Sequence, residues 1–230
     1  MIFRQLYESK EKQLAYVLGD PVTREAVAID LRLGHLGEAQ EFLQRRGLRL
    51  RFVLQTHWEP EQRQAALLLR EQSGARILAQ ESIDDSAVDM RIRHEDLLYF
   101  GEESLRVLHT PGLTPCAVMY HWEDRIFTGE TLLAGGFPSA LGKARGSALR
   151  SQLQRIFAHL PDETLVYPAR ESRGRRLGSL EELRRHWSRS GDPGLFTRCT
   201  QYLQHEAVKK SPATSTDEPQ QRLVSGPVLL

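Results

Sequence analysis

Residues 56–62, THWEPEQ, have the frame of a metal-binding loop at the end of a strand. Imidazole and carboxylate groups are common protein ligands of zinc, iron and manganese. His57 is the one first-choice transition-metal ligand in the segment, while Glu59 and Glu61 offer carboxylate oxygens. The two glutamates flank Pro60, which favours the first position of a helix, where acidic side chains are stabilising in any case. The segment therefore leaves two interpretations open, a metal site with unusual ligands and a former site that no longer binds metal.

Cys116 could supply a different chemistry. A cysteine thiolate stabilised by a neighbouring cation is a strong nucleophile and could accept sulfur as a persulfide. Against this, Cys116 begins the apolar run CAVMY, and a free cysteine in such a run is commonly buried and inert. Thiol chemistry at Cys116 remains the less favoured alternative.

The composition excludes some classes of partner. The 230 residues are 40% hydrophobic, and 31 Lys and Arg against 30 Asp and Glu leave a net charge of +1, so no field gathers nucleic acid or an anionic membrane. No run approaches the roughly 18 apolar residues of a membrane span, and the first residues lack a secretory pattern. Two distant cysteines make no disulfide framework. We expect a cytoplasmic protein with no nucleic-acid or membrane partner.

The periodicity of apolar residues predicts the elements that position these side chains. Short runs rich in β-formers, separated by turn residues, predict an antiparallel meander followed by a strand that leads into His57. Helices are predicted over 36–46 and 60–73, each stopped by a glycine. The strands of this half are expected at residues 2–7, 15–18, 26–30 and 49–56.

The second half repeats the order of strands followed by helices. Two hairpins are predicted, one turning at Gly101 and one at Glu123-Asp124. This pattern predicts an α+β fold of two packed sheets covered by helices, in one domain over 1–208 with a disordered tail over 209–230. The other elements expected are strands at 75–79 and 164–167 and helices at 147–159, 180–187 and 194–208.

Seven stretches in order resemble the metallo-β-lactamase superfamily, most closely its persulfide dioxygenase and glyoxalase II-like branch. The resemblance spans about residues 2 to 185 and implies an αββα sandwich with a metal site at one edge of its two sheets. The stretches are MIFRQLYE, AVAID, VLQTH, SGARI, LRVLHTPGLTPCAVMY, RIFTGE and LPDETLVYPARESRG.

The chain departs from the family at the positions where the resemblance implies metal ligands. The family carries T-H-x-H-x-D-H where this chain has residues 56–62, so only the first histidine remains. The later histidine of the family's H-T-P-G-H-T is Leu113 here, although His109 is kept, the aspartate of T-G-D is Glu130, and the histidine of P-A-H is Arg170.

These departures break both ligand sets that the resemblance implies. A mononuclear iron dioxygenase of this branch would use two histidines and one carboxylate, at His57, Leu113 and Glu130, and leucine cannot bind a metal. A hydrolase of the other branch would hold two zinc ions. Arg170 adds a permanent cation, which repels a metal ion and can pair with Glu130 instead. The zinc positions map to His57, Glu59, Glu61, Gln62, Leu113, Glu130 and Arg170.

We therefore interpret the chain as a degenerate family member without a catalytic metal, which acts as a binding or regulatory protein. Its partner would be a small thiol, a glutathione-like ligand or another protein. The alternative is an active hydrolase or sulfur-metabolism enzyme, with His57, Glu130 and Cys116 as catalytic candidates and Zn, Fe, Mn or Mg on a remodelled site of His57, Glu59, Glu61 and Glu130. The predicted cavity comprises His57, Glu59, Glu61, Gln62, His109, Leu113, Glu130 and Arg170.

Overall fold

The computed structural model describes residues 2–134, 136, 143–189 and 223–224. The helix predicted over 194–208, Cys199, and the tail apart from its residues 223–224 lie outside this part of the chain. Within the described residues, no helix is long and apolar enough to cross a membrane.

The first sheet is mixed and has six strands in sequence order, β1 to β6. The predicted antiparallel meander forms β1 to β3, and β3 to β6 then run parallel; α1 and α2 join β3 to β4 and β4 to β5, and a loop joins β5 to β6. The elements are β1 (Ile2–Glu8), β2 (Gln13–Gly19), β3 (Glu25–Ile29), the 3-10 turn η1 (Leu33–His35), α1 (Leu36–Arg46), β4 (Arg49–Leu54), α2 (Pro60–Ser73), β5 (Arg76–Gln80) and β6 (Met90–Ile92).

The second sheet has seven strands in the order β12-β11-β10-β9-β8-β7-β13. Both predicted hairpins are present, and β10 and β11 run parallel. Leu223 and Val224 pair in parallel with Leu97 and Leu98 at the sheet edge. The elements are β7 (Leu97–Phe100), β8 (Glu103–His109), β9 (Val118–Trp122), β10 (Arg125–Gly129), α3 (Lys143–Phe157), β11 (Leu165–Pro168), β12 (Gly178–Ser179), α4 (Leu180–Arg189) and β13 (Leu223–Val224).

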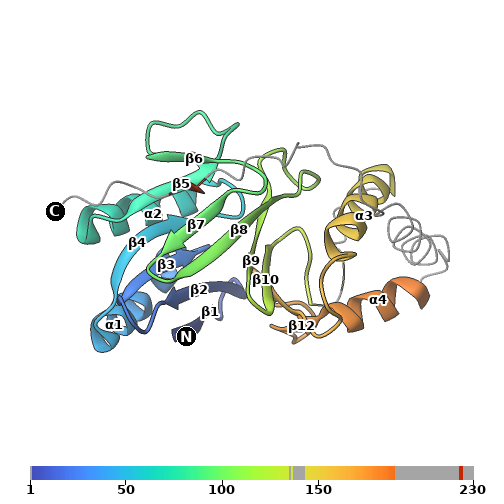
Figure 1. Cartoon of the computed structure of the whole chain (residues 1–230), viewed down its shortest axis with the longest axis horizontal. Helices are drawn as coiled ribbons and strands as arrows, with labels where there is room; N and C mark the ends of the chain where they lie inside the picture. The colour runs from blue at the N-terminus through green and yellow to red at the C-terminus, as the bar shows by residue number, and fades with distance from the viewer. Residues whose placement is uncertain (1, 135, 137–142, 190–222, 225–230) are drawn as a thin grey trace, which may run out of the picture.

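Three apolar layers hold the sheets and helices together. The central layer lies between the sheets and buries the rings of Tyr16, Phe52 and Trp122 among the aliphatic residues of both. A second layer joins the first sheet to α1 and α2, and a third joins the second sheet to α3 and α4. In Figure 1 the helices accordingly lie on the two outer sides of the paired sheets. The predicted αββα sandwich is confirmed.

The strand pairing brings four chain segments, those that follow β3, β4, β10 and β11, to one edge of the sandwich. Because β3 and β4 are parallel, the residues that follow them emerge at the same edge of the first sheet. The same holds for the residues after β10 and β11 in the second sheet. A backbone hydrogen bond from Val118 N to Thr56 O, 2.8 Å long, ties the two sheets together there. The segments predicted to carry chemistry are therefore neighbours.

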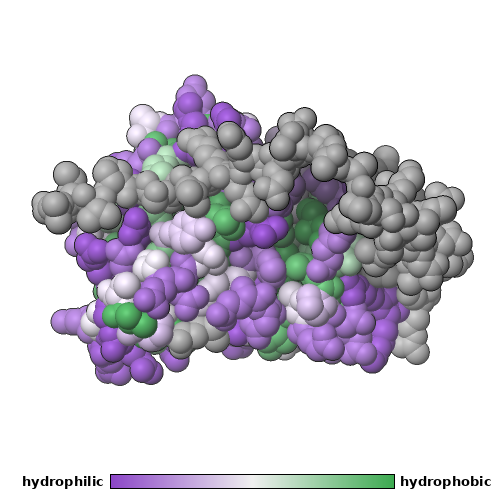
Figure 2. All heavy atoms as spheres, viewed as in Figure 1, coloured by the Kyte–Doolittle hydropathy of each residue, from purple (hydrophilic) through white to green (hydrophobic). Residues whose placement is uncertain are grey.

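The viewed surface is mostly hydrophilic. In Figure 2, hydrophobic side chains are visible at the floor of a hollow between the sheets and the region of α3.

Candidate functional site

A buried aspartate anchors the loop that carries THWEPEQ. Asp30 follows β3 with a φ of 56°, is 2% exposed, and accepts hydrogen bonds from the Thr56 backbone N–H at 2.8 Å and from Thr56 Oγ1. Gln62 Nε2 lies 3.5 Å from the same carboxylate. Burial raises the pKa of Asp30, and His57 and the hydrogen bonds from Thr56 only partly oppose this. The loop is thus fixed by a carboxyl group that no solvent reaches.

A close backbone approach sets the position of Glu130. Gly129 ends β10 with a φ of 58°, and a Cβ atom placed on it would lie 2.7 Å from the Cβ of Thr56. Only glycine accepts both this dihedral angle and this contact. The next residue, Glu130, therefore leaves the second sheet directly beside the loop of the first.

Arg32 is the central cation of the site. Its guanidinium donates to Glu59 Oε2 at 2.8 Å and to Glu61 Oε2 at 3.0 Å, and lies 3.7 Å from Glu130 Oε1. The Arg32 side chain is 11% exposed. Burial lowers the pKa of Arg32, but Glu61 and Glu59 outweigh it and raise the pKa above its usual value. One guanidinium thus bridges three carboxylates from two different sheets.

A second arginine and a histidine complete the cluster. Arg170, which follows β11, has both Nε and Nη2 3.4 Å from Glu130 Oε1, so the ion pair expected from the sequence is present. His57 is 7% exposed; its Nδ1 is 3.1 Å from Thr56 Oγ1, and its Nε2 is 3.3 Å from Glu59 Oε1 without hydrogen-bond geometry. Burial raises the pKa of Glu59, but His57 and Arg32 lower it by more, so the net shift is downward. We call these residues the arginine–glutamate cluster: Arg32, His57, Glu59, Glu61, Glu130 and Arg170.

The remaining predicted residues lie apart from this network or at its margin. Gln62 is fully buried beneath the loop, and its Oε1 has no hydrogen-bond partner among the described residues. Leu113 and Cys116, both half-buried, lie in the loop between β8 and β9, where Cys116 Sγ is 3.5 Å from Thr114 Oγ1. His109 lines a different pocket, on the outer face of the second sheet, and its Nε2 contacts Pro115 O at 2.9 Å.

Sequence reasoning missed Arg32. Sequence analysis assigned to Arg170 the positive charge that neutralises the glutamates, whereas in the structure Arg32 makes shorter contacts and reaches more carboxylates. A usable signal was present, because a crossover from β3 to β4 makes the two strands parallel and brings the residues after each of them to one edge. A basic residue two positions after Asp30 could therefore have been placed opposite the acidic loop.

The residues present do not fit the metal-ligand sets that the family resemblance implies. Two guanidinium groups face the carboxylates that would bind a cation, and arginine keeps its charge at every accessible pH. Across the described residues, no group of three or more His, Cys, Asp or Glu side chains has an arrangement that could hold a metal ion. The cluster as it stands can pair charges and offer hydrogen-bonding groups to a ligand.

Sequence comparison finds relatives of two kinds, persulfide dioxygenases and hydroxyacylglutathione hydrolases. No family model matches the chain. The human mitochondrial persulfide dioxygenase ETHE1 is 28% identical over 210 residues, which cover 88% of this chain and 79% of the relative. A hydroxyacylglutathione hydrolase from Rhizobium etli is 32% identical over 152 residues, which cover 64% of this chain and 58% of the relative.

Solved structures agree with these sequence relatives. A metallo-β-lactamase from Staphylococcus aureus has the same fold, with a TM-score of 0.71 at 21% identity over 93% of this chain and 68% of that one. The crystal structure of ETHE1 from Myxococcus xanthus matches with a TM-score of 0.73 and 30% identity, covering 92% of both chains. The chain therefore belongs to the metallo-β-lactamase superfamily, in the branch that contains the ETHE1 persulfide dioxygenases and the hydroxyacylglutathione hydrolases.

Proposed function

We propose that this chain is a metal-independent member of its family and acts as a binding or regulatory protein. The observation that carries the proposal is the position of Arg32, whose guanidinium lies 2.8 to 3.7 Å from Glu59, Glu61 and Glu130. A dication among these carboxylates would have to displace Arg32 and also lie near Arg170. Displacing the largely buried Arg32 would break its ion pairs with the three glutamates, and Arg170 would repel the dication. Both effects cost free energy.

The charge count of the cluster supports the same proposal. Three carboxylates face two guanidinium groups, and His57 is close enough to Glu59 to contribute when protonated. The carboxylates are thus already largely neutralised by side chains of the chain itself. Internal neutralisation removes the electrostatic driving force by which such a group would gather a free cation.

For the ligand, we propose a glutathione-like molecule or another small thiol. Support comes from the names of the relatives, one of which is a hydrolase of hydroxyacylglutathione. The Arg170 side chain is 45% exposed, so one guanidinium of the cluster remains open to an incoming carboxylate. Isothermal titration with glutathione tests this point, and loss of binding in Arg170→Gln is the expected result.

A second candidate function is a hydrolase with a remodelled metal site. It is favoured by one observation, the buried Nε2 of His57, which has no hydrogen-bond partner among the described residues although it faces Glu59. A buried imidazole nitrogen without a partner is costly, and a metal would satisfy it. His57, Glu59, Glu61 and Glu130 would then be the ligands, after Arg32 had moved away.

Metal analysis separates the two candidates. Untagged protein is purified without chelators, incubated in turn with Fe²⁺, Zn²⁺ and Mn²⁺, dialysed and measured by elemental analysis. We expect far less than one equivalent of metal in the wild type, and near-stoichiometric metal in the variant Arg32→Ser/Leu113→His/Arg170→His, which removes both cations and adds two ligands. The control Arg45→Ser lies on α1 and should behave as the wild type. Near-stoichiometric metal in the wild type that is lost in His57→Ala would overturn the proposal and favour the hydrolase.

A further inference from the structure

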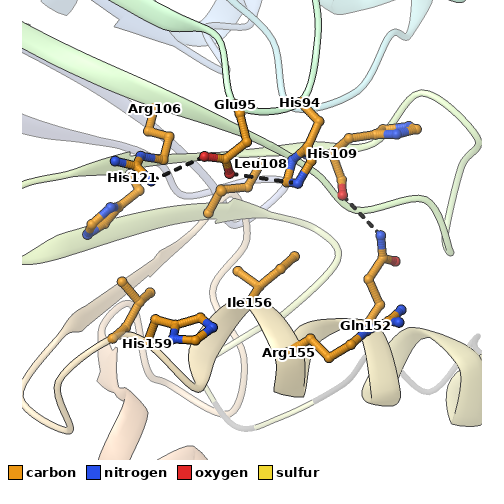
Figure 3. Close-up of a pocket in the computed structure, with 11 residues that line it drawn as sticks. His94, Glu95, Arg106, Leu108, His109, His121, Gln152, Arg155, Ile156 and His159 are labelled. Atoms are coloured by element: carbon orange, nitrogen blue, oxygen red, sulfur yellow. Dashed lines mark hydrogen bonds and ion pairs between the residues drawn. The ribbon is translucent and has the colours of Figure 1, made fainter. Parts of the chain in front are cut away.

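A second pocket lies on the outer face of the seven-stranded sheet, away from the arginine–glutamate cluster. It has a volume of about 600 Å³ and opens between the β6–β7 turn, β8 and β9 on one side and α3 on the other (Figure 3). The residues that the following argument uses are His94, His109, His121, His159, Arg106 and Arg155.

Histidine is concentrated in this pocket. Four of the eight histidines of the chain border it, from four separate segments, although the ring of His109 points away and only its backbone carbonyl faces Gln152. Figure 3 shows His94 and His121 on the sheet side and His159 on the helix side, with their rings pointing in different directions. In the described part of the chain no metal-holding group of side chains exists, so these imidazoles do not form a metal site. Their shared property is that a ring N–H can donate a hydrogen bond to an anionic ligand.

The permanent charges of the pocket favour an anion. Arg106 pairs with Glu95 at 3.1 Å, and His94 Nε2 is 3.7 Å from the same carboxylate. Arg155 also lines the pocket from α3, and no hydrogen bond or ion pair with another described residue holds it. Two guanidinium groups against one carboxylate leave a positive surplus before any histidine is protonated.

The floor of the pocket is apolar. Leu108, which is 5% exposed, lines the pocket from β8, and Figure 3 shows Ile156 opposite it on the helix side. Leu160 also lines the pocket. Inorganic anions gain nothing from such a surface, whereas an aromatic or acyl group loses unfavourable contact with water there. The lining therefore has two parts, a basic rim and an apolar floor.

We propose that this pocket binds a small organic anion, with its charged group at Arg155 and the histidines and its apolar body against Leu108 and Ile156. Nothing in the arginine–glutamate cluster takes part, so the inference is independent of the proposed function.

Protonation of His121 should strengthen this binding. Burial lowers the pKa of His121, and Arg106 lowers it further, against the opposing effects of Glu95 and a backbone contact at Glu123. A bound anion adds a negative charge beside His121 and favours its protonated form, so affinity should rise as the pH falls below about 6.5. The charged or titratable side chains that face the pocket are His94, Glu95, Arg106, His121, Arg155 and His159.

Titration with benzenesulfonate and with methanesulfonate, at pH 7.5 and at pH 5.5, tests the proposal, because each sulfonate keeps one negative charge throughout this range. The full-length protein is titrated in a calorimeter, and the histidine side chains are observed by long-range ¹H–¹⁵N NMR. We expect saturable binding of benzenesulfonate that is tighter at pH 5.5, with shifts at His94, His121 and His159. Arg155→Gln should weaken binding about tenfold, as expected for the loss of one charge-assisted contact, whereas Arg45→Gln, a solvent-exposed arginine on α1, should not.

Each other outcome contradicts part of the proposal. No saturable binding of either probe, or equal binding by Arg155→Gln and the wild type, overturns it. Equal affinity for the two probes overturns the role of the apolar floor. Binding that is unchanged between pH 7.5 and pH 5.5 overturns the role of His121. Arg155 is exposed on its helix, so its substitution should leave the fold intact, and circular dichroism checks this.

Discussion

Replacement of Arg32 by methionine should destabilise the protein by about 2 kcal/mol at pH 7. The methionine keeps most of the buried aliphatic volume and removes the guanidinium, so the decrease in the free energy of unfolding measures the contribution of the charge. The two short contacts, at 2.8 and 3.0 Å, are charge-assisted hydrogen bonds. Removing one partner of a fully buried ion pair costs about 3 to 5 kcal/mol, and an exposed pair contributes about 0 to 1 kcal/mol. Arg32 is 11% exposed but Glu59 and Glu61 are 43% and 47% exposed, which sets the value between these limits.

The assay is urea unfolding followed by circular dichroism, supported by thermal melting. A loss of about 2 kcal/mol corresponds to a decrease of roughly 4 to 8 °C in the melting temperature of a domain of this size. The measurement also has a pH signature. Although burial raises the pKa of Glu59, His57 and Arg32 lower it below its usual 4.5, so its stabilising contribution is present above pH 4.5 and is lost as the pH falls through the lowered pKa. The deficit of Arg32→Met should therefore shrink in acid.

Two comparisons make the prediction specific. Arg45→Met, which removes an exposed i,i+4 partner of Glu41, should change the free energy of unfolding by less than about 0.5 kcal/mol. The double variant Arg32→Met/Glu59→Gln should recover part of the loss, because it removes a carboxylate left without its cation. Stability of Arg32→Met equal to that of the wild type at pH 7, or a deficit that persists unchanged in acid, would refute the reasoning that Arg32 neutralises this cluster.

Three further results are expected. Gly129→Ala should cost more than about 3 kcal/mol in urea unfolding, because its φ of 58° and the contact with Thr56 both oppose a Cβ atom, and stability within about 1 kcal/mol of the wild type would contradict this. Tyr120→Phe should lose about 1 to 2 kcal/mol, since the buried hydroxyl donates to Gln55 O at 2.9 Å and the carbonyl is left without this donor; an unchanged unfolding midpoint would count against that bond. Burial raises the pKa of Glu25, but two arginines and a backbone N–H lower it by more, so the stabilising contribution of Glu25 should be present above pH 4.5 and disappear in acid. Glu25→Gln should therefore reduce the pH dependence of the free energy of unfolding between about pH 3 and 5. A pH profile identical to that of the wild type would exclude this role.

The fold was largely predictable because its signals are local. The runs at residues 2–7, 15–18 and 26–30 alternate or cluster as strands do, and Pro60 and Gly74 mark the start and stop of α2. Short or irregular elements were not predicted. β6 has three residues and β12 has two, which is too few for periodicity to register. The third helix begins at Lys143, four residues before the predicted start, since no capping residue marks that point.

The candidate site was predictable in part. The grouping of His57, Glu59, Glu61 and Glu130 follows from a family resemblance over about residues 2 to 185, and the structure brings these residues together. His109 was expected in the same cavity, but its ring contacts Pro115 O, and its backbone carbonyl accepts from Gln152 Nε2 at the pocket on the outer face of the second sheet. Residues on one strand point to alternate faces, so His109 and its neighbour Leu108, which lines that pocket, do not both turn their side chains into it.

The sequence by itself determined the superfamily and the two-sheet architecture, since these depend on residue identity and local pattern. Only the tertiary structure decided which charge faces which. Arg32 and Glu59 are 27 residues apart, and Arg32 and Glu130 are on different sheets, so their contacts depend on strand pairing and sheet packing. Electrostatic interaction depends on distance in space, which the sequence specifies only through the completed fold.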